Sequence, residues 1–310
     1  MMHAIRKWYY DNKEKILATI MLIAFIFLFI NILDDYYENK QNENNKVNIT
    51  NIMTKENINN KIKDGELISN DSVTTGESVS GEKLSKDIIL IDKFISNCSN
   101  GKIEEAYELL SDECKETNFP TLEAFKMNYY NPIFNIPKIY TAQNWSGNTY
   151  KVKIIDDILK TGKVSDKDFQ DYITIPDSSK EKININGYIG RTTKGKITET
   201  DNLEITYVKK ETYMDYEEYT IRVKNLTTKE IILDSGESTK NIYLLDNNNV
   251  KQYVNTAEIN YDNLLLKPGT IKEYTFRFSN SYSISRIMKT LNFENIIINE
   301  NDITKIIIKL

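Results

Sequence analysis

The feature that most constrains this chain is an uninterrupted apolar stretch near its N-terminus, Ile16–Leu33. Its eighteen residues carry no charge, and only Thr19 and Asn31 are polar. A helix of that length spans roughly 27 Å, close to the hydrocarbon thickness of a bilayer. The stretch therefore predicts a single-pass transmembrane helix over residues 16–33, with the lipid bilayer as the first expected partner.

Charges on the two flanks of the stretch predict its orientation. Residues 1–15 contain four Lys or Arg side chains, whereas the other flank opens with Asp34 and Asp35. An excess of Lys and Arg marks the cytoplasmic side of a membrane helix. We therefore expect a cytoplasmic tail at 1–15, a location in the cell membrane and extracellular C-terminal domains.

Three other interpretations of the stretch fit less well. A cleaved signal peptide has a shorter apolar region and small residues at its cleavage site, which residues 31–37 lack. A lipoprotein anchor requires a Cys directly after the apolar run, and the first Cys is Cys98. A core helix of a globular domain is rarely apolar on every face.

Composition argues against several classes of function. The formal net charge is −5 and no basic patch is present, so no nucleic acid partner is expected. The single histidine, His3, lies in the predicted cytoplasmic tail. The predicted outer part then has no His for a catalytic triad or a zinc site, and we expect no enzyme, no cofactor and no metal site. The abundance of Asn, Ile and Lys is typical of AT-rich genomes such as those of low-GC Gram-positive bacteria.

Cys98 and Cys114 are the only cysteines, and both fall in the predicted outer part. One ends a predicted helix and the other follows the next helix, so an antiparallel hairpin would bring them together. A disulfide between them and a pair of free buried thiols are both compatible with this spacing.

The pattern beyond the membrane segment changes along the chain. Residues 34–84 are polar without a sustained period and predict a flexible extracellular tether. From Ser85 apolar residues recur at helical spacing, and Thr121 is placed to cap a third helix. Alternating strand patterns follow to about residue 196. Helices first and strands after predict an α+β domain over 85–196.

Two segments of this region resemble a known fold. Residues 94–110, FISNCSNGKIEEAYELL, and residues 119–125, FPTLEAF, are similar to the opening helices of an NTF2-like domain. The resemblance implies three helices packed on a curved sheet that forms a cup. In enzymes of that superfamily the cup holds an Asp and a Tyr, positions that Asp171, Tyr172, Tyr140 or Tyr150 would supply here. The alternative is that these residues lie on the rim or at the surface.

The last third of the chain has the pattern of a β-sandwich. Short alternating strands are separated by turn signals at 225–227, 246–249 and 267–269, and the final run 303–310 is an expected edge or closing strand. The segments 219–227, 243–246 and 266–269 resemble the immunoglobulin-like domains of bacterial surface proteins, without their Cys and Trp signature. We therefore expect an immunoglobulin-like sandwich over 197–310.

Two further acidic segments of this part have both a functional and a structural interpretation. Asp246–Asn249 with Asp234 suggests a calcium loop, but the spacing lacks an EF-hand pattern and favours a hairpin tip. The acidic, tyrosine-rich run 211–219 suggests a docking surface or, alternatively, an edge and turn of the sandwich.

The predicted layout is a transmembrane helix, a tether, an NTF2-like α+β domain and an all-β domain. It resembles single-pass membrane-anchored proteins of clostridia and their relatives, and more distantly the anchored components of conjugation channels. The expected function is that of a non-catalytic interaction or scaffold protein of a Gram-positive cell envelope, with an envelope protein or a second copy as partner. The alternatives are a ligand-binding or enzymatic NTF2-like cup and a component of a conjugation or secretion assembly.

Overall fold

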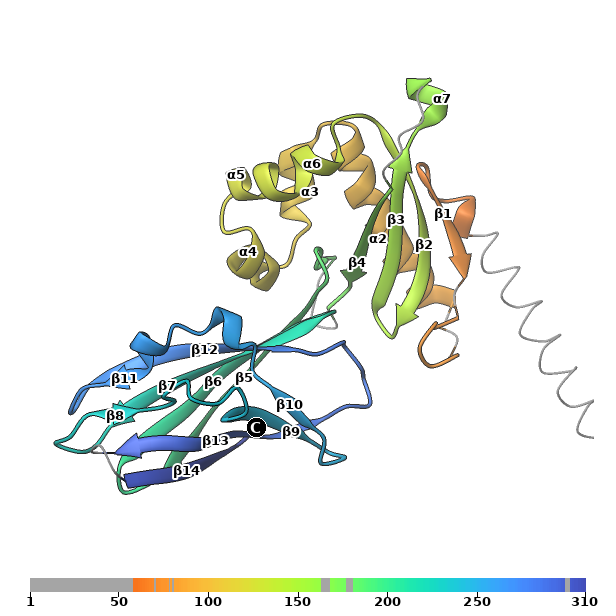
Figure 1. Cartoon of the computed structure of the whole chain (residues 1–310). Helices are drawn as coiled ribbons and strands as arrows, with labels where there is room; N and C mark the ends of the chain where they lie inside the picture. Colours follow the sequence, from red (N-terminus) through yellow and green to blue (C-terminus); the bar gives the residue numbers. More distant parts are fainter. Residues whose placement is uncertain are drawn as a thin grey trace, which may run out of the picture. The chain divides into compact units, whose positions relative to one another are not determined.

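The computed structural model describes residues 58–69, 71–77, 79, 81–162, 168–176, 181–298 and 302–310. The chain divides into residues 1–57 and 58–310, and the description below concerns the second unit (Figure 1). The predicted cytoplasmic tail, the predicted membrane helix at 16–33 and the first part of the predicted tether lie outside the described residues.

Most of the helices are short because caps and prolines interrupt the helical region. The long one, α2 (Gly81–Ser99), buries Ile88, Ile91 and Ile95 at helical spacing. The others are α3 (Ile103–Glu108), α4 (Asp112–Asn118), α5 (Leu122–Phe125), the π-helical turn η1 (Lys126–Tyr130), α6 (Asn131–Ile133) and α7 (Ile158–Thr161). Ser111 caps α4 by accepting from Cys114 N, and Thr121 caps α5 by accepting from Ala124 N, which confirms the predicted Thr121 cap.

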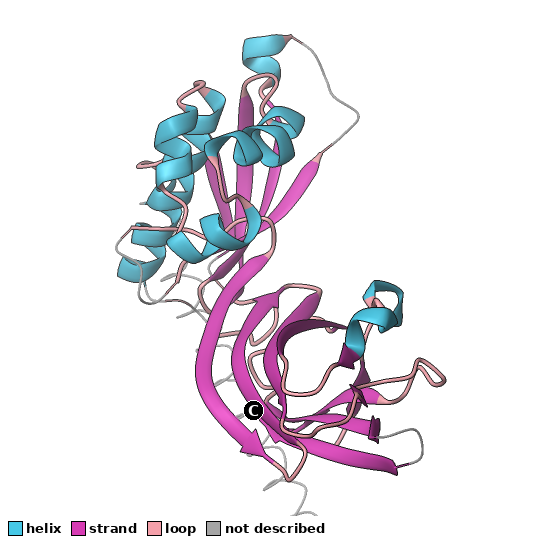
Figure 2. Cartoon of the chain, turned by 90° about the vertical axis from the view of Figure 1, so that its left-hand side faces the viewer, coloured by secondary structure: helices cyan, strands magenta, loops and turns pink. Residues whose placement is uncertain are grey.

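The first sheet packs against these helices. Its strands are β1 (Gly65–Ser69), β2 (Lys138–Ser146), β3 (Thr149–Asp156) and β4 (Phe169–Thr174), in that spatial order. β1 pairs parallel to β2, and the other pairs are antiparallel. The helices gather over one face of this sheet (Figure 2), and the two layers share the first hydrophobic cluster.

Two further sheets enclose the second hydrophobic cluster. One has the order β12–β7–β6–β5, and the other has the order β10–β9–β13–β8–β11 with β14 beside β13. Their strands are β5 (Tyr188–Glu199), β6 (Leu203–Tyr213), β7 (Tyr216–Asn225), β8 (Ile231–Ile232), β9 (Ile242–Asp246), β10 (Lys251–Tyr253), β11 (Leu265–Leu266), β12 (Ile271–Ser279), β13 (Met288–Ile298) and β14 (Asp302–Lys309). Two 3₁₀ turns, η2 (Thr256–Glu258) and η3 (Tyr261–Leu264), precede β11. Inward-facing residues of both sheets, such as Tyr219, Phe276 and Phe293, meet in this core.

Part of the predicted tether belongs to the first core. Ile58, Ile62 and Leu67 are buried there, and Leu67 N donates to Asn59 Oδ1 at 2.9 Å. Gly65 allows β1 to approach the ring of Tyr140 closely. The apolar residues of this segment looked isolated in the sequence because each is buried by residues far away in the chain.

The predicted fold class, α+β with a transmembrane helix, an NTF2-like domain and an immunoglobulin-like sandwich, is wrong. Strand makes up 44% of the described residues and helix 24%, so the fold is mainly β. The physical reason is that α3, α4 and α7 are short and α5, η1 and α6 together cover only 122–133, whereas the strands β5, β6 and β13 alone run for 11 or 12 residues each.

The predictions of a membrane anchor, a cell-membrane location and extracellular domains also need correction. The segment on which they rested, 16–33, is outside the described residues. Among the residues that are described, no helix combines the length and apolar character that crossing a bilayer requires.

Candidate functional site

Asp171, the candidate carboxylate of the predicted cup, is buried in β4 and engaged on both oxygens. Its Oδ2 accepts from Tyr129 Oη at 2.7 Å and from Asn186 N at 2.9 Å. Its Oδ1 accepts from Tyr172 N at 2.7 Å and from Gly187 N at 3.0 Å. Burial raises the pKa of Asp171 above its ordinary value, although these four hydrogen bonds act in the opposite direction. Asn186 and Gly187 both have positive φ angles, so the carboxylate holds a tight turn.

Aromatic side chains fill the space beside Asp171. The ring of Tyr129 lies with its centroid 5.8 to 6.4 Å from five others, those of Phe94, Phe119, Phe125, Phe134 and Phe169. Pairs at such distances form a packed core and contribute beyond their buried area. Asp171 therefore acts as a structural anchor inside this cluster.

Two other tyrosines predicted for the cup also donate their hydroxyls to buried carboxylates. Tyr150 Oη donates to Asp87 at 2.7 Å, and Tyr140 Oη donates to Asp92 at 3.3 Å. Both carboxylates come from α2, and sequence reasoning missed them, although each interrupts an apolar run of that helix. The remaining candidate, Tyr172, is half-buried and packs edge-on against Trp145.

Cys98 in α2 and Cys114 in α4 are free thiols in this structure. Both are fully buried, and burial raises their pKa values, that of Cys114 to about 11. A thiol with a raised pKa is a poor nucleophile near neutral pH. Of the two alternatives left open by the sequence, the structure has the pair of free buried thiols.

The acidic turn segments have structural roles. Asp246 Oδ1 accepts from the backbone of Asn248 and Val250, so 246–250 forms the tip between β9 and β10. Asp234 accepts from Gly236 N and Asn241 Nδ2. Within the described ranges, no group of three or more His, Cys, Asp or Glu residues could hold a metal ion. The run 211–219 forms the hairpin of β6 and β7.

Our candidate site is instead the free edge of β14. Within the part of the chain that the structure describes, β14 pairs with β13 and with no other strand. Ile303 and Ile307 face outward and are 65% and 48% exposed, and Lys305 and Lys309 alternate with them. Ile306 and Ile308 face the core. An edge strand with exposed apolar side chains is a template for pairing with another chain.

Two lysine side chains lie beside this edge, each in contact with a neighbouring side chain. Lys305 Nζ donates to Glu294 Oε1 at 2.7 Å, and Tyr243 Oη donates to the same oxygen at 2.5 Å. These bonds, that from Lys305 first, lower the pKa of Glu294. Lys251 Nζ lies 4.0 Å from the centre of the Tyr243 ring. Lys305 is thus paired with Glu294, and Lys251 lies over the ring of Tyr243 beside it.

The edge of the other sheet, β5, is built differently. Its pairing with β6 shifts between Thr193 and Lys196, where Gly195 has a φ of +63°. A bulge in the edge strand itself opposes further pairing, and here the extra residues lie on β5, whereas the register shift of the β13–β14 pair lies on β13. The exposed Ile197 on this strand is therefore a matched reference for the isoleucines of β14.

Comparisons with known proteins do not assign this chain to a family. No family model matches it, and no curated protein matches it. It is similar to a solved structure, a conserved hypothetical protein from Bacillus anthracis, with 14% sequence identity and a TM-score of 0.25. The match covers 38% of this chain and 96% of that protein.

Proposed function

We propose that this chain is a non-catalytic interaction protein that binds an extended segment of a partner protein along β14. The observation that carries the proposal is the free, isoleucine-bearing edge of that strand. The carboxylate that would have suggested catalysis, Asp171, supports a non-catalytic role because its four hydrogen bonds hold a turn.

The backbone geometry of β14 suits strand addition. Leu310 N, one residue past the end of β14, donates to Lys289 O in β13. In an antiparallel pair successive residues direct their backbone groups alternately to either side. The N–H and C=O groups of residues 303, 305, 307 and 309 therefore face away from β13, where a partner segment adds by main-chain hydrogen bonds.

Charge favours a foreign segment over a second copy. Every second residue of β14, on its outward face, is alternately isoleucine and lysine. A partner strand whose side chains on the same face are alternately apolar and acidic therefore matches both. A second copy would bring the same two lysines, Lys305 and Lys309, into the new ribbon. Like charges in such a ribbon oppose pairing.

Binding of a designed peptide to the full chain tests the proposal. The probe is a labelled peptide of about ten residues, a typical strand length, in which every second residue is alternately Val and Glu and the residues between them are Thr. The I303T/I307T double variant, which removes the apolar side chains without adding charge, should bind it at least about tenfold more weakly by fluorescence anisotropy. The matched variant Ile197→Thr, on the edge of β5, should bind it like the wild type. Bound peptide should also protect the amides of residues 303, 305, 307 and 309 from hydrogen exchange.

Three results would overturn the proposal. The first is no binding of the acidic peptide, and the second is equal binding of the same peptide with Lys in place of Glu. The third is sedimentation equilibrium showing a dimer that I303T/I307T dissociates, since a second copy would then be the occupant of this edge.

A further inference from the structure

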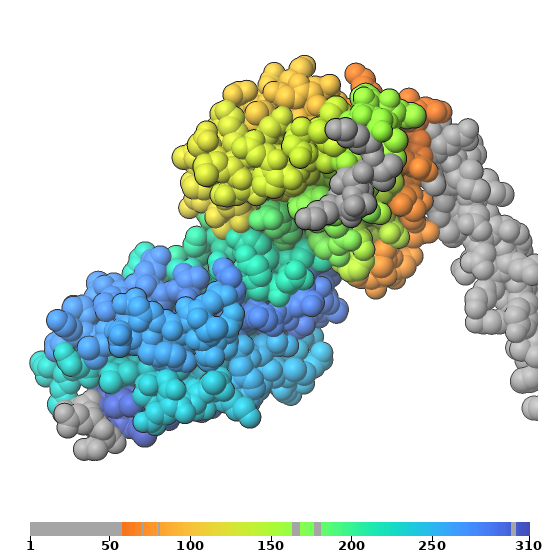
Figure 3. Space-filling model, turned by 45° about the horizontal axis from the view of Figure 1, so that its top comes forward, coloured from red at the N-terminus to blue at the C-terminus, as the bar shows by residue number. Residues whose placement is uncertain are grey.

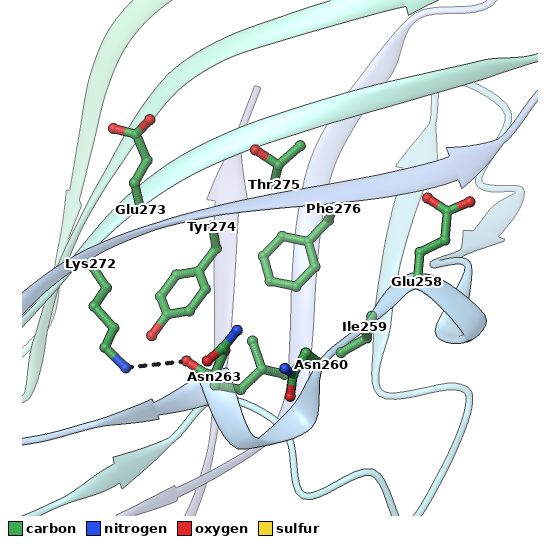
Figure 4. A pocket seen from close by; sticks show the side chains of 10 residues that line it. Glu258, Ile259, Asn260, Asn263, Lys272, Glu273, Tyr274, Thr275 and Phe276 are labelled. Atoms are coloured by element: carbon green, nitrogen blue, oxygen red, sulfur yellow. Dashed lines mark hydrogen bonds between the residues drawn. The ribbon is translucent and has the colours of Figure 1, made fainter.

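A pocket lies on another side of the second core, between β12 and the turns η2 and η3. Its volume is about 360 Å³, within the range of small-molecule sites. Figure 4 shows the rings of Tyr274 and Phe276 pointing from β12 toward the segment that carries Asn260 and Asn263. The part of the chain around residues 250–275 forms part of the blue surface in Figure 3.

Tyr274 has an unusual environment in this pocket. The residue is 8% exposed, and its hydroxyl is buried without a hydrogen-bond partner among the described residues. Burial raises the pKa of Tyr274 to about 12, so the phenol is neutral at physiological pH. Tyr129 and Tyr150, in contrast, donate their buried hydroxyls to carboxylates. A buried hydroxyl without a partner calls for an explanation, and a ligand that bonds to it supplies one.

The charged groups around the pocket are engaged elsewhere. Lys272 Nζ donates to the backbone oxygens of Leu265 and Asn263 at 2.8 and 3.4 Å. Glu258 Oε1 accepts from Arg277 at 3.1 Å. Glu273, a third charged residue of the lining, accepts from Arg222 at 3.2 Å. The lining also carries three neutral polar side chains, the Tyr274 phenol and the carboxamides of Asn260 and Asn263.

We propose that this pocket binds a neutral ring bearing several hydroxyl groups, such as one sugar unit of a glycan. A hydroxyl group both donates and accepts, as do a phenol and a carboxamide, so each can pair in either sense. The rings of Tyr274 and Phe276, whose centroids lie 6.3 Å apart, make the β12 side of the pocket apolar, which suits the C–H groups of such a ring. The site is separate from the edge of β14, so the proposal does not depend on the proposed function.

The test uses the full chain and a panel of neutral monosaccharides, glucose, galactose, mannose and N-acetylglucosamine. At about 10 mM, at least one should bind by saturation-transfer NMR with a millimolar Kd. Tyr274→Phe keeps the ring and removes the hydroxyl, so it should weaken that binding at least about tenfold. Because the hydroxyl has no partner in the free protein, the same variant should keep or raise the melting temperature. Tyr253→Phe, on β10, is the matched control and should bind like the wild type.

The outcomes separate a binding role from a packing defect. Loss of binding in Tyr274→Phe with an unchanged melting temperature supports the proposal. No binding by any sugar, equal binding by Tyr274→Phe, or binding of acetate or phosphate in preference to the sugars would overturn it. Binding of a neutral dipeptide amide in preference to every sugar would also overturn it, because the ligand class would then be a peptide.

Discussion

The hydroxyl of Tyr129, in η1, donates a 2.7 Å hydrogen bond to Asp171 Oδ2, in β4, and both residues are almost fully buried. This bond ties the helical layer to the first sheet. The same carboxylate accepts from the turn at Asn186 and Gly187. One buried acid thus joins three segments of the chain.

Removing this acid should destabilise the fold more than removing the phenol. Asp171→Ala leaves buried donors without acceptors and should lower the free energy of unfolding by about 3–4 kcal/mol. Tyr129→Phe should lower it by about 1–2 kcal/mol. Tyr172→Phe, at a half-buried neighbour, is the control and should change it by less than about 0.5 kcal/mol. Urea unfolding measures all three, and equal effects of Asp171→Ala and Tyr172→Phe would contradict the anchoring role.

The raised pKa of Asp171 predicts a particular dependence of stability on pH. The folded state holds this proton more tightly than the unfolded state, whose carboxyl titrates near 3.8. Its contribution to stability is therefore present below that pH and is lost as pH rises through the folded pKa. The unfolding free energy of the wild type, measured relative to Asp171→Asn, should fall from pH 4 toward neutrality. If this difference in unfolding free energy instead rises from pH 4 toward neutrality, the four hydrogen bonds affect the pKa of Asp171 more than burial does.

Cys98 and Cys114 should behave as two protected thiols. Because burial raises both pKa values and blocks access, neither should react with a thiol reagent at pH 8 in the folded protein. Both should react in denaturant without prior reduction. A linked Cys98–Cys114 peptide in a non-reduced digest would contradict the structure.

Gly65→Ala should be destabilising although β1 lies in a polar part of the sequence. A Cβ at this position would clash with the ring of Tyr140. Tyr140 is 1% exposed and its hydroxyl donates a hydrogen bond to Asp92, so the ring has little room to move. Overpacking of this kind costs about 1–3 kcal/mol. Ile68→Ala, at a half-exposed position of the same strand, is the control and should cost less than about 0.5 kcal/mol. Equal melting temperatures of the two variants would mean that β1 is not packed as described.

Local signals in the sequence predicted much of the local structure. The alternation in residues 203–207, 219–223 and 274–278 falls within β6, β7 and β12, and the final run forms the edge strand β14. The cap at Thr121 and the hairpin tip at Asp246 are also where the sequence placed them. These features depend on neighbours a few residues apart, so their physics is present in any short window.

Tertiary structure alone decided the role of the candidate residues and the balance of the fold. Asp171 meets a phenol 42 residues away, and Tyr150 meets a carboxylate 63 residues away. No local pattern encodes such a pair, because the partner depends on which face of a helix packs against the sheet. Gly65–Ser69 becomes a strand because β2 offers it a free edge and Tyr140 leaves space for a glycine. The partnerless hydroxyl of Tyr274 and the open edge of β14 likewise exist only once distant segments have packed, since exposure and hydrogen bonding are properties of the folded surface.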